Sequence, residues 1–87
     1  MKDKIIVIVN IPFLNVRDDL EIPVNISAID LISALSYIYK IPVERSNIFN
    51  YYLKADNPKA LLRGEKPLID YGLRDGSEIW LWNTKGE

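Results

Sequence analysis

The chain has 87 residues, of which 48% are hydrophobic, and its 11 basic and 12 acidic residues give a formal net charge of -1. This length suits one domain, 1–87, and the charge balance argues against a dedicated nucleic-acid binder or a polybasic membrane anchor. The sequence contains no Cys and no His, which excludes disulfides, thiol nucleophiles, Cys/His zinc sites and histidine-based triads. We therefore expect no metal, no cofactor and no catalytic residue.

No segment has the pattern of a membrane span. The longest apolar run near the start covers 5–9 and is broken by Asn10 and Pro12, far short of the ~20 residues that a span needs. The run is also followed by no small-residue cleavage site typical of a signal peptide. A cytoplasmic protein without direct membrane insertion is the expectation.

The first third of the chain predicts a β-hairpin. The β-branched residues of 4–11 favour a strand that ends near Pro12, which cannot donate to a ladder. Residues 13–15 form the expected connection to a second strand over 16–22, where apolar and acidic residues alternate. Pro23 ends this strand.

One helix is predicted over 28–40. Ser27 is a suitable N-cap, Asp30 lies near the positive end of the helix dipole, and Pro42 prevents continuation beyond Lys40. Apolar residues recur at a helical spacing and should face the core. This stripe consists of Ala28, Leu31, Leu35 and Ile38, flanked by Ile32 and Tyr39.

The remaining sequence predicts three further strands and a tail. They are a strand over 48–54, a polar loop over 55–59, a short strand over 60–63, a partly apolar connector over 68–73, an Asp75-Gly76 turn, a strand over 77–82 and a flexible tail over 83–87. The order β-β-α-β-β-β favours an α+β fold in which one helix packs on one face of a mixed sheet. This is the order of the ubiquitin-like β-grasp fold.

Two stretches carry a more specific resemblance. One is 19–23, followed by 30–32 in the helix; the other is 68–76, followed by 79–81. The second contains Leu-Ile-Asp-Tyr and resembles the Leu-x-Asp-Tyr-x-Ile segment of ubiquitin. Over nearly its whole length the chain resembles the YukD/EsaB family, the small ubiquitin-like proteins of Gram-positive type VII (WXG100) secretion systems. The resemblance implies a cytoplasmic, non-enzymatic accessory or regulatory factor whose partner is a component of the secretion apparatus.

The family is not thought to be conjugated to targets, and the end of the sequence agrees with this. Modifiers and sulfur carriers present a slim Gly-Gly carboxylate that an adenylating enzyme can thread into its active site. Here a single glycine, Gly86, is followed by the charged Glu87. We therefore expect no conjugation and no sulfur transfer.

Three residues of the ubiquitin-like segment are expected to be structural. By analogy with ubiquitin-like folds, Tyr71 packs under the connector and its hydroxyl binds nearby backbone, as a buried tyrosine usually does. Asp70 is expected to be a cap or turn acceptor and Gly72 to adopt a positive φ. The carboxylate pairs 18–19 and 75/78 are expected to be solvated rather than catalytic.

The last strand predicts an exposed aromatic surface. Successive side chains of a strand point to opposite faces, so if Ile79 and Leu81 face the helix, Trp80 and Trp82 face away. In the β-grasp topology the first and fifth strands are parallel neighbours, which should bring these tryptophans together with Ile6 and Ile8. On the third strand the outward set would be Ile48, Asn50 and Tyr52, and the inward set Phe49, Tyr51 and Leu53. Both of its faces are apolar, so the pattern does not determine its register.

One helix covers one face of a sheet, whereas these strands are apolar on both faces. The surplus predicts an apolar interaction patch with Trp and Tyr as anchors. The patch consists of Trp80, Trp82, Ile6, Ile8, Tyr52 and Asn50. Its partner is a protein or, through the same face, a second copy of the chain. The alternatives are a minor cluster on a monomer, a ubiquitin-like adaptor unrelated to secretion, and base stacking on the tryptophans, which scattered and balanced basic residues disfavour.

Overall fold

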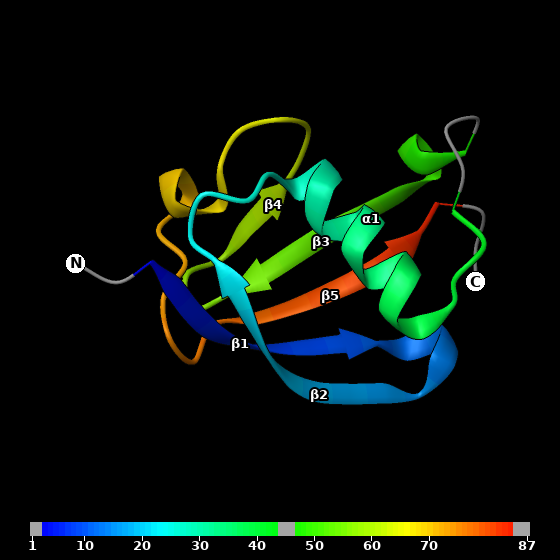
Figure 1. The fold of residues 1–87 in the computed structure, drawn as a ribbon, viewed down its shortest axis with the longest axis horizontal. Helices are drawn as coiled ribbons and strands as arrows, with labels where there is room; N and C mark the ends of the chain where they lie inside the picture. The colour runs from blue at the N-terminus through cyan, green and yellow to red at the C-terminus, as the bar shows by residue number, and fades with distance from the viewer. Residues whose placement is uncertain (1–2, 44–46, 85–87) are drawn as a thin grey trace.

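The computed structural model describes residues 3–43 and 47–84, in which one α-helix crosses a mixed β-sheet (Figure 1). The strands are β1 (Lys4–Ile11), β2 (Val16–Pro23), β3 (Tyr51–Asp56), β4 (Ala60–Leu62) and β5 (Glu78–Asn83), and the helix is α1 (Ala28–Tyr39). The short 3-10 helices are η1 (Pro12–Leu14), η2 (Ile48–Asn50) and η3 (Leu68–Tyr71). The predicted order of two strands, a helix and three strands is confirmed.

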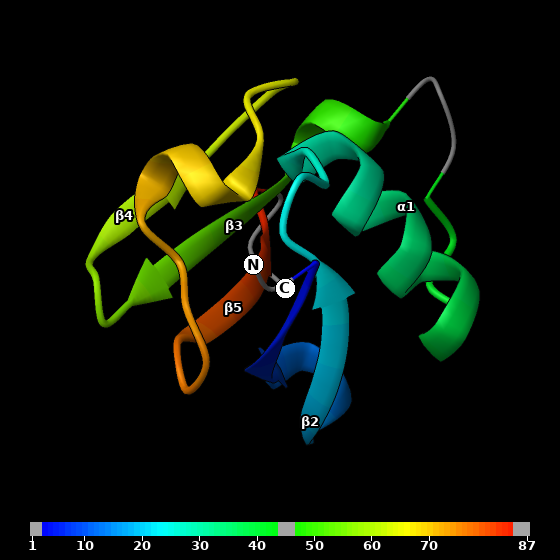
Figure 2. The ribbon, with the colours of Figure 1, turned by 60° about the vertical axis from the view of Figure 1, so that its left-hand side comes forward.

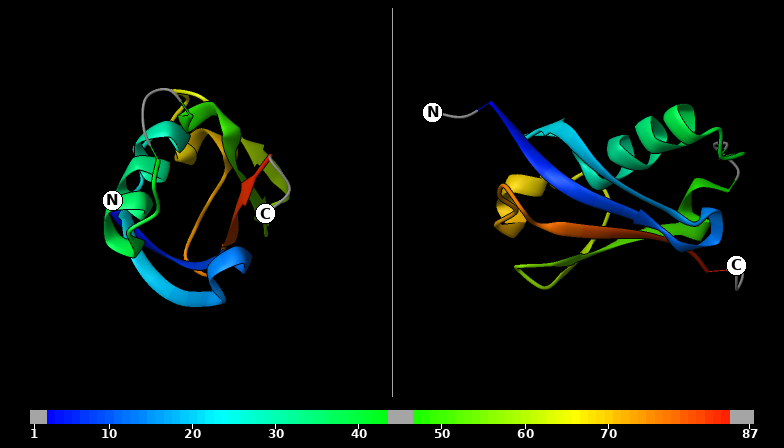
Figure 3. Two further views of the ribbon diagram at one scale, coloured as in Figure 1. Left: turned by 90° about the vertical axis from the view of Figure 1, so that its right-hand side faces the viewer. Right: turned by 90° about the horizontal axis from the view of Figure 1, so that it is seen from below.

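The strand order across the sheet is β2-β1-β5-β3-β4, so the first and last strands are neighbours at its centre. β1 and β5 run parallel, whereas the other neighbouring strands run antiparallel. Figures 2 and 3 show α1 on one side of this sheet. This is the predicted α+β architecture of a β-grasp fold. We call the face of the sheet opposite α1 the outer face.

The β1–β2 hairpin follows the predicted alternation. The inward residues of β1 are buried, and its register pairs Ile11 with Val16 next to the connection. The connection starts earlier than expected, because Pro12 occupies the first position of η1, where its missing N–H is not needed. It ends on Asn15, which adopts a left-handed φ of 55°.

α1 begins at the predicted residue. The Ser27 hydroxyl accepts a hydrogen bond from the Asp30 backbone N–H at 3.1 Å, which satisfies one of the free N–H groups of the first turn. The helix ends at Tyr39, one residue earlier than predicted, because Lys40 adopts a left-handed φ of 58° and its N–H donates to the Ser36 carbonyl. Neither α1 nor any other helix in the described ranges has the length and apolar character that crossing a membrane requires.

The predicted core stripe of α1 is wrong at its last position. Ala28, Leu31 and Leu35 are buried, but Ile38 is 49% exposed. Seven residues advance a helix by about 20° less than two full turns, so Ile38 lies beyond the edge of the stripe that Leu31 sets. Ile32, which was expected only to flank the stripe, is buried in its place.

The third strand starts later than its predicted range of 48–54. The Asn50 N–H donates to the Asn47 carbonyl at 2.9 Å, which closes the 3-10 turn of η2 and delays β3 until Tyr51. Phe49 was expected to point inward, but in this turn it leaves the strand alternation and is 78% exposed. From Tyr51 onward the predicted alternation holds, with Tyr51 and Leu53 buried.

β3 also ends later than predicted. Ala55 was assigned to a polar loop, but it is buried and pairs with Ala60 of β4, and Asp56 pairs with Glu78 of β5. The turn between β3 and β4 therefore covers 57–59. The sequence pattern missed this because a small alanine and a single aspartate do not signal a strand.

The buried Ser77 ties the turn after β3 to the loop before β5. Its hydroxyl donates to the Asn57 carbonyl at 2.6 Å and accepts a hydrogen bond from the Arg74 N–H at 3.0 Å. The Arg74 guanidinium also donates to the Asn57 side chain at 2.6 Å. Gly76 has a φ of 88°, as the predicted Asp75-Gly76 turn requires. β5 then begins at Glu78 rather than at Ser77.

The predicted tail contributes two residues to the fold. Asn83 is the last residue of β5, and the Thr84 N–H donates to the Asn50 carbonyl at 2.7 Å. The rest of the predicted tail, 85–87, lies outside the described residues.

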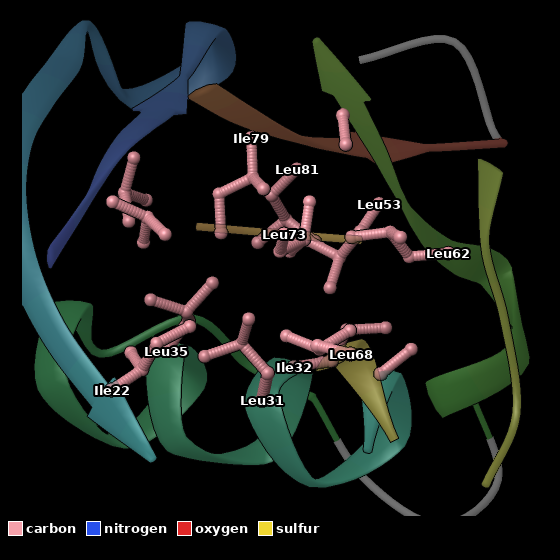
Figure 4. Packing of buried hydrophobic residues seen from close by; sticks show 14 of the residues in the cluster. Ile22, Leu31, Ile32, Leu35, Leu53, Leu62, Leu68, Leu73, Ile79 and Leu81 are labelled. Atoms are coloured by element: carbon pink, nitrogen blue, oxygen red, sulfur yellow. The ribbon is translucent and has the colours of Figure 1, made fainter. Parts of the chain in front are cut away.

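The hydrophobic core fills the space between α1 and the sheet (Figure 4). Side chains from α1 meet side chains from β3, β4 and β5, and the connector before β5 adds two leucines. Residues of this cluster that Figure 4 labels are Ile22, Leu31, Ile32, Leu35, Leu53, Leu62, Leu68, Leu73, Ile79 and Leu81. The core lies on one face of the sheet, which leaves the residues of the outer face available for other contacts.

Candidate functional site

The two tryptophans of β5 lie on the outer face. Ile79 and Leu81 are fully buried on the side of α1, and Trp80 and Trp82 alternate with them. Both indole rings are half-buried. In the views of Figure 3, no helix of the described residues lies on this side of the sheet. The orientation predicted for both tryptophans is confirmed.

Ile6 and Ile8 also point to the outer face, but they are staggered relative to the tryptophans. The parallel register pairs Ile8 with Glu78 and Asn10 with Trp80. Ile6 lies a further row away, where its carbonyl accepts a hydrogen bond from the Gly76 N–H at 2.9 Å. The prediction that Ile6 lies beside the tryptophans is therefore wrong, because the register places a turn next to it, whereas Ile8 stands diagonally from Trp80.

A polar cluster that the sequence pattern did not reveal lies at the centre of the outer face. Asn10 is only 7% exposed, and its side-chain nitrogen donates to the Ile79 carbonyl at 3.2 Å and to the Glu78 carboxylate at 3.3 Å. Arg17 of β2 donates to the Asn10 side-chain oxygen and to Glu78, both at 2.8 Å. The hydrogen bond from Arg17 is the main reason why the pKa of Glu78 lies below its usual 4.5, against an opposing effect of partial burial.

The cluster of Arg17, Asn10 and Glu78 divides the outer face. Ile8 of β1 stands beside Glu78 of β5, and Asn10 of β1 stands beside Trp80 of β5, so the four side chains form the corners of a square. The hydrogen bond from Asn10 to Glu78 runs along one diagonal of this square. The apolar pair Ile8 and Trp80 occupies the other diagonal. The outer face thus has one apolar area around Ile6 and Ile8 and another around the tryptophans. The alternation in β1 predicts that the Asn10 side chain points to the outer face. Its hydrogen-bond partners could not be predicted, because they depend on the register between strands.

The second area extends from β5 across β3 to β4. Trp82 stands opposite Tyr52, and Trp80 stands opposite Lys54, which in turn stands opposite Leu61 of β4. Tyr52 is half-buried and Leu61 is 43% exposed. We call Trp80, Trp82, Tyr52 and Leu61 the tryptophan patch. Leu61 was not among the predicted patch residues, although it alternates with Leu62 in the predicted fourth strand.

An open groove of about 610 Å3 runs along the tryptophan patch. Its lining combines two indole rings and an aliphatic side chain with two lysines and one aspartate. The full lining is Lys54, Ala55, Asp56, Lys59, Ala60, Leu61, Trp80 and Trp82. Tyr52 borders a different hollow, of about 360 Å3, together with Phe49 and Arg63.

Asn50 does not occupy the predicted strand position. It belongs to η2, where its carbonyl accepts the Thr84 N–H at 2.7 Å. Its predicted place in an alternating outward row with Tyr52 is therefore wrong. The 3-10 turn removes it from the pleat that would have aligned the two side chains.

Two of the three residues expected to be structural behave as predicted. The Tyr71 hydroxyl donates to the Arg63 carbonyl at 3.3 Å and accepts from the Arg63 N–H at 3.4 Å, and the Lys66 ammonium lies 4.7 Å from its ring centre. Gly72 caps η3 with a φ of 83°. The carboxylate of Asp70 is exposed and accepts no hydrogen bond from the residues in 3–43 and 47–84, so its expected capping role is not observed.

One carboxylate of the predicted acidic pair at 18–19 is engaged. Asp18 of β2 accepts a hydrogen bond from the Tyr39 hydroxyl of α1 at 2.8 Å. Burial, with this hydrogen bond and the charge of Asp18, raises the pKa of Tyr39 to about 12. Across 3–43 and 47–84, no three Asp or Glu residues gather closely enough to hold a metal ion. The chemistry that the outer face offers is therefore apolar and aromatic contact beside fixed charges.

Solved structures match the whole fold. A ubiquitin-like domain of an Arabidopsis thaliana protein aligns with a TM-score of 0.74 over 95% of this chain and 80% of its own, at 20% identity. A ubiquitin-like domain from tubulin-binding cofactor B gives 0.74 over 98% and 94%, at 19% identity. The ubiquitin of Caldiarchaeum subterraneum gives 0.68 over 92% of each chain, at 15% identity.

No protein-family model matches the sequence, and no curated protein matches it either. At the identities of the solved structures the likeness establishes the fold alone. The chain thus has the ubiquitin-like β-grasp fold. Its resemblance to the YukD/EsaB family stays a prediction.

Proposed function

We propose that this ubiquitin-like module is a non-enzymatic, non-conjugated interaction protein that binds a protein partner through the tryptophan patch. The observation that carries the proposal is the placement of Trp80 and Trp82 side by side on the face opposite α1. Trp and Tyr combine a large apolar surface with a polar group, and they are enriched among the residues that dominate binding energy. Leu61 adds an exposed aliphatic side chain to the same surface.

The composition of the central strands supports this proposal. Strands with apolar side chains on both faces are normally covered on both faces, whereas α1 covers one face of this sheet. Burying the indole rings against a partner would remove apolar area from water, at roughly 25 cal/mol per Å2. If the indole rings only packed against each other on an isolated domain, no partner would bury them and this binding energy would not be gained.

The secretion-related part of the proposal has a different support. It rests on the resemblance of 68–76 and 79–81 to the YukD/EsaB family, which implies a cytoplasmic accessory or regulatory factor of a type VII secretion system. Its partner would be a component of that apparatus. A gene for this chain next to genes for WXG100 proteins and an FtsK-type ATPase would favour this assignment, and a different neighbourhood would favour a ubiquitin-like adaptor outside secretion.

The test compares the wild type with the double variant Trp80→Ala/Trp82→Ala in affinity capture from a native lysate, followed by mass spectrometry. Tyr37→Ala is the matched control, because Tyr37 is an aromatic residue on α1 that is 87% exposed. The proposal predicts that a defined partner is captured by the wild type and the control and is lost with the double variant. Circular dichroism verifies that each variant is folded.

Equal capture by a folded double variant would refute the role of the patch. A captured partner with no connection to secretion would refute the type VII assignment and leave the interaction module standing. Sizing chromatography at several concentrations reports whether the partner is a second copy of the chain.

A further inference from the structure

The groove beside the tryptophans carries two lysines that have no ionic partner among the described residues. Lys54 is exposed, stands opposite Trp80 on β3, and Lys59 lies in the turn that leads into β4. Neither ammonium group forms an ion pair or hydrogen bond with a residue of 3–43 or 47–84. Arg17 on the same face, by contrast, is held by Glu78 at 2.8 Å. Two unpaired positive charges therefore lie on the β4 side of the outer face.

The lining of the groove also defines its polarity. The lining contains two lysines and a single acidic residue, Asp56. Asp56 stands opposite Glu78 at the start of β5, so these two carboxylates form an acidic row of the sheet. Away from this acidic row, Trp80 and Leu61 flank Lys54 within one row of the sheet. An apolar side chain that enters between Trp80 and Leu61 would thus bring its neighbouring residues next to an ammonium group.

We propose that the groove binds an acidic segment of a partner protein, in which a bulky apolar side chain is flanked by carboxylates. The apolar side chain contacts Trp80 and Leu61, and the carboxylates interact with Lys54 and Lys59. This inference rests on the proposed function, since it names the chemistry of the partner that the tryptophan patch binds. The polar cluster of Arg17, Asn10 and Glu78 lies outside the groove, on the β1 side of Trp80.

The two parts of the contact differ in weight. An exposed ion pair between a lysine and a carboxylate changes affinity by about twofold to fivefold. The lysines therefore contribute more to selecting an acidic segment than to the overall binding affinity. A desolvated tryptophan anchor changes affinity by about thirtyfold or more. Raising the ionic strength should weaken binding through the lysines alone, because salt screens exposed charges.

The experiment uses the full chain and three fluorescein-labelled decapeptides. The acidic peptide has a central Phe flanked by two Asp and two Glu; the amide peptide replaces these by Asn and Gln; the basic peptide replaces them by Lys. Fluorescence anisotropy gives the dissociation constants, and the indole N–H signals of Trp80 and Trp82 in NMR spectra locate the site. Charge reversal at Lys54 and Lys59 is compared with Lys4→Glu, which makes the same change at the far end of the outer face.

The proposal predicts that the acidic peptide binds at least threefold more tightly than the amide peptide and shifts both indole signals. Lys54→Glu and Lys59→Glu should each weaken it by about tenfold, Trp80→Ala by about thirtyfold, and Lys4→Glu by less than twofold. Equal binding of the acidic and amide peptides at the indoles would overturn the acidic assignment while the proposed patch stands. The absence of acidic-peptide binding, or a dimer that buries Trp80, would also overturn it.

Discussion

Asn10 organises the outer face at the scale of single residues. It is almost fully buried, and both polar atoms of its side chain have partners on neighbouring strands. A buried polar group left unpaired costs about 1–3 kcal/mol, so Arg17 and Glu78 are held in place by the same contacts that satisfy Asn10. Trp80, which pairs with Asn10 across β1 and β5, therefore borders charged groups that are joined by hydrogen bonds.

The ion pair between Arg17 and Glu78 predicts an acid-dependent loss of stability. Folding lowers the pKa of Glu78 below 4.5, so its contribution is present above pH 4.5 and is lost as the pH falls through the folded-state pKa. Glu78→Gln should remove this dependence. Urea unfolding of the wild type and the variant at a series of pH values measures it, and the two stabilities should converge as the pH falls below about 4.5.

Glu21→Gln is the control for this measurement. Glu21 lies on β2 of the same face, is exposed, and forms no ion pair with the described residues. Its substitution should leave the wild-type pH dependence below pH 4.5 in place. If the stability of Glu78→Gln still falls below pH 4.5 as the wild type does, the ion pair is not the source of the acid-dependent loss.

Burial of Tyr39, together with its hydrogen bond to Asp18, predicts that stability depends on pH at the alkaline end of the scale as well. The folded-state pKa of Tyr39 is raised from 10.0 to about 12, so its contribution to stability is complete below pH 10 and is lost as the pH rises through 12. In Tyr39→Phe this alkaline loss should be smaller. Titration of the Tyr39 ring signals by NMR should give a pKa of about 12, and a value near 10 would contradict the effect of burial and of the contact with Asp18.

At the scale of elements, α1 offers a direct test of which side chains form the core. Leu35 is fully buried, whereas Ile38 is 49% exposed, although the sequence pattern placed both in one stripe. Leu35→Ala should lower the free energy of unfolding by about 2–5 kcal/mol, and Ile38→Ala by less than about 1 kcal/mol. Urea denaturation of both variants measures the difference. Equal losses would mean that the helix is rotated relative to the structure.

The sequence predicts the elements where local chemistry decides them. Ser27 as N-cap, Pro12 as strand end and the turn at 75–76 each follow from the residue concerned and its neighbours. The alternation in β1, β2 and β5 is equally local, because a strand with one buried face repeats every two residues. These parts of the fold therefore follow from the amino-acid sequence alone.

The segment that leads into β3 shows where sequence reasoning stops. Its apolar residues occur on both faces, so no alternation distinguishes a strand from the 3-10 turn that Asn47 and Asn50 close. Phe49 was consequently placed inward, although it is 78% exposed. Whether this segment forms a strand or a 3-10 turn depends on contacts with residues distant in the chain, such as the hydrogen bond from Thr84 to Asn50.

At the scale of the whole molecule, the 48% hydrophobic content acquires a second meaning. One helix packs on one face of the sheet (Figure 3), and part of the apolar content beyond the core, including Ile6 and Leu61, lies on the outer face. The sequence predicted which side chains of β1 and β5 point outward. It could not predict the groove, because the offset between β1 and β5 and the pairing of β5 with β3 decide which side chains meet.

The most direct test of the central claim is the dissociation constant of the captured partner protein, measured by calorimetry with the wild type, Trp80→Ala and Tyr37→Ala. If the tryptophan patch binds the partner, Trp80→Ala should weaken the complex by about thirtyfold or more, and Tyr37→Ala should leave it unchanged. A folded Trp80→Ala variant that binds within twofold of the wild type would contradict the claim that the outer face is the interaction surface.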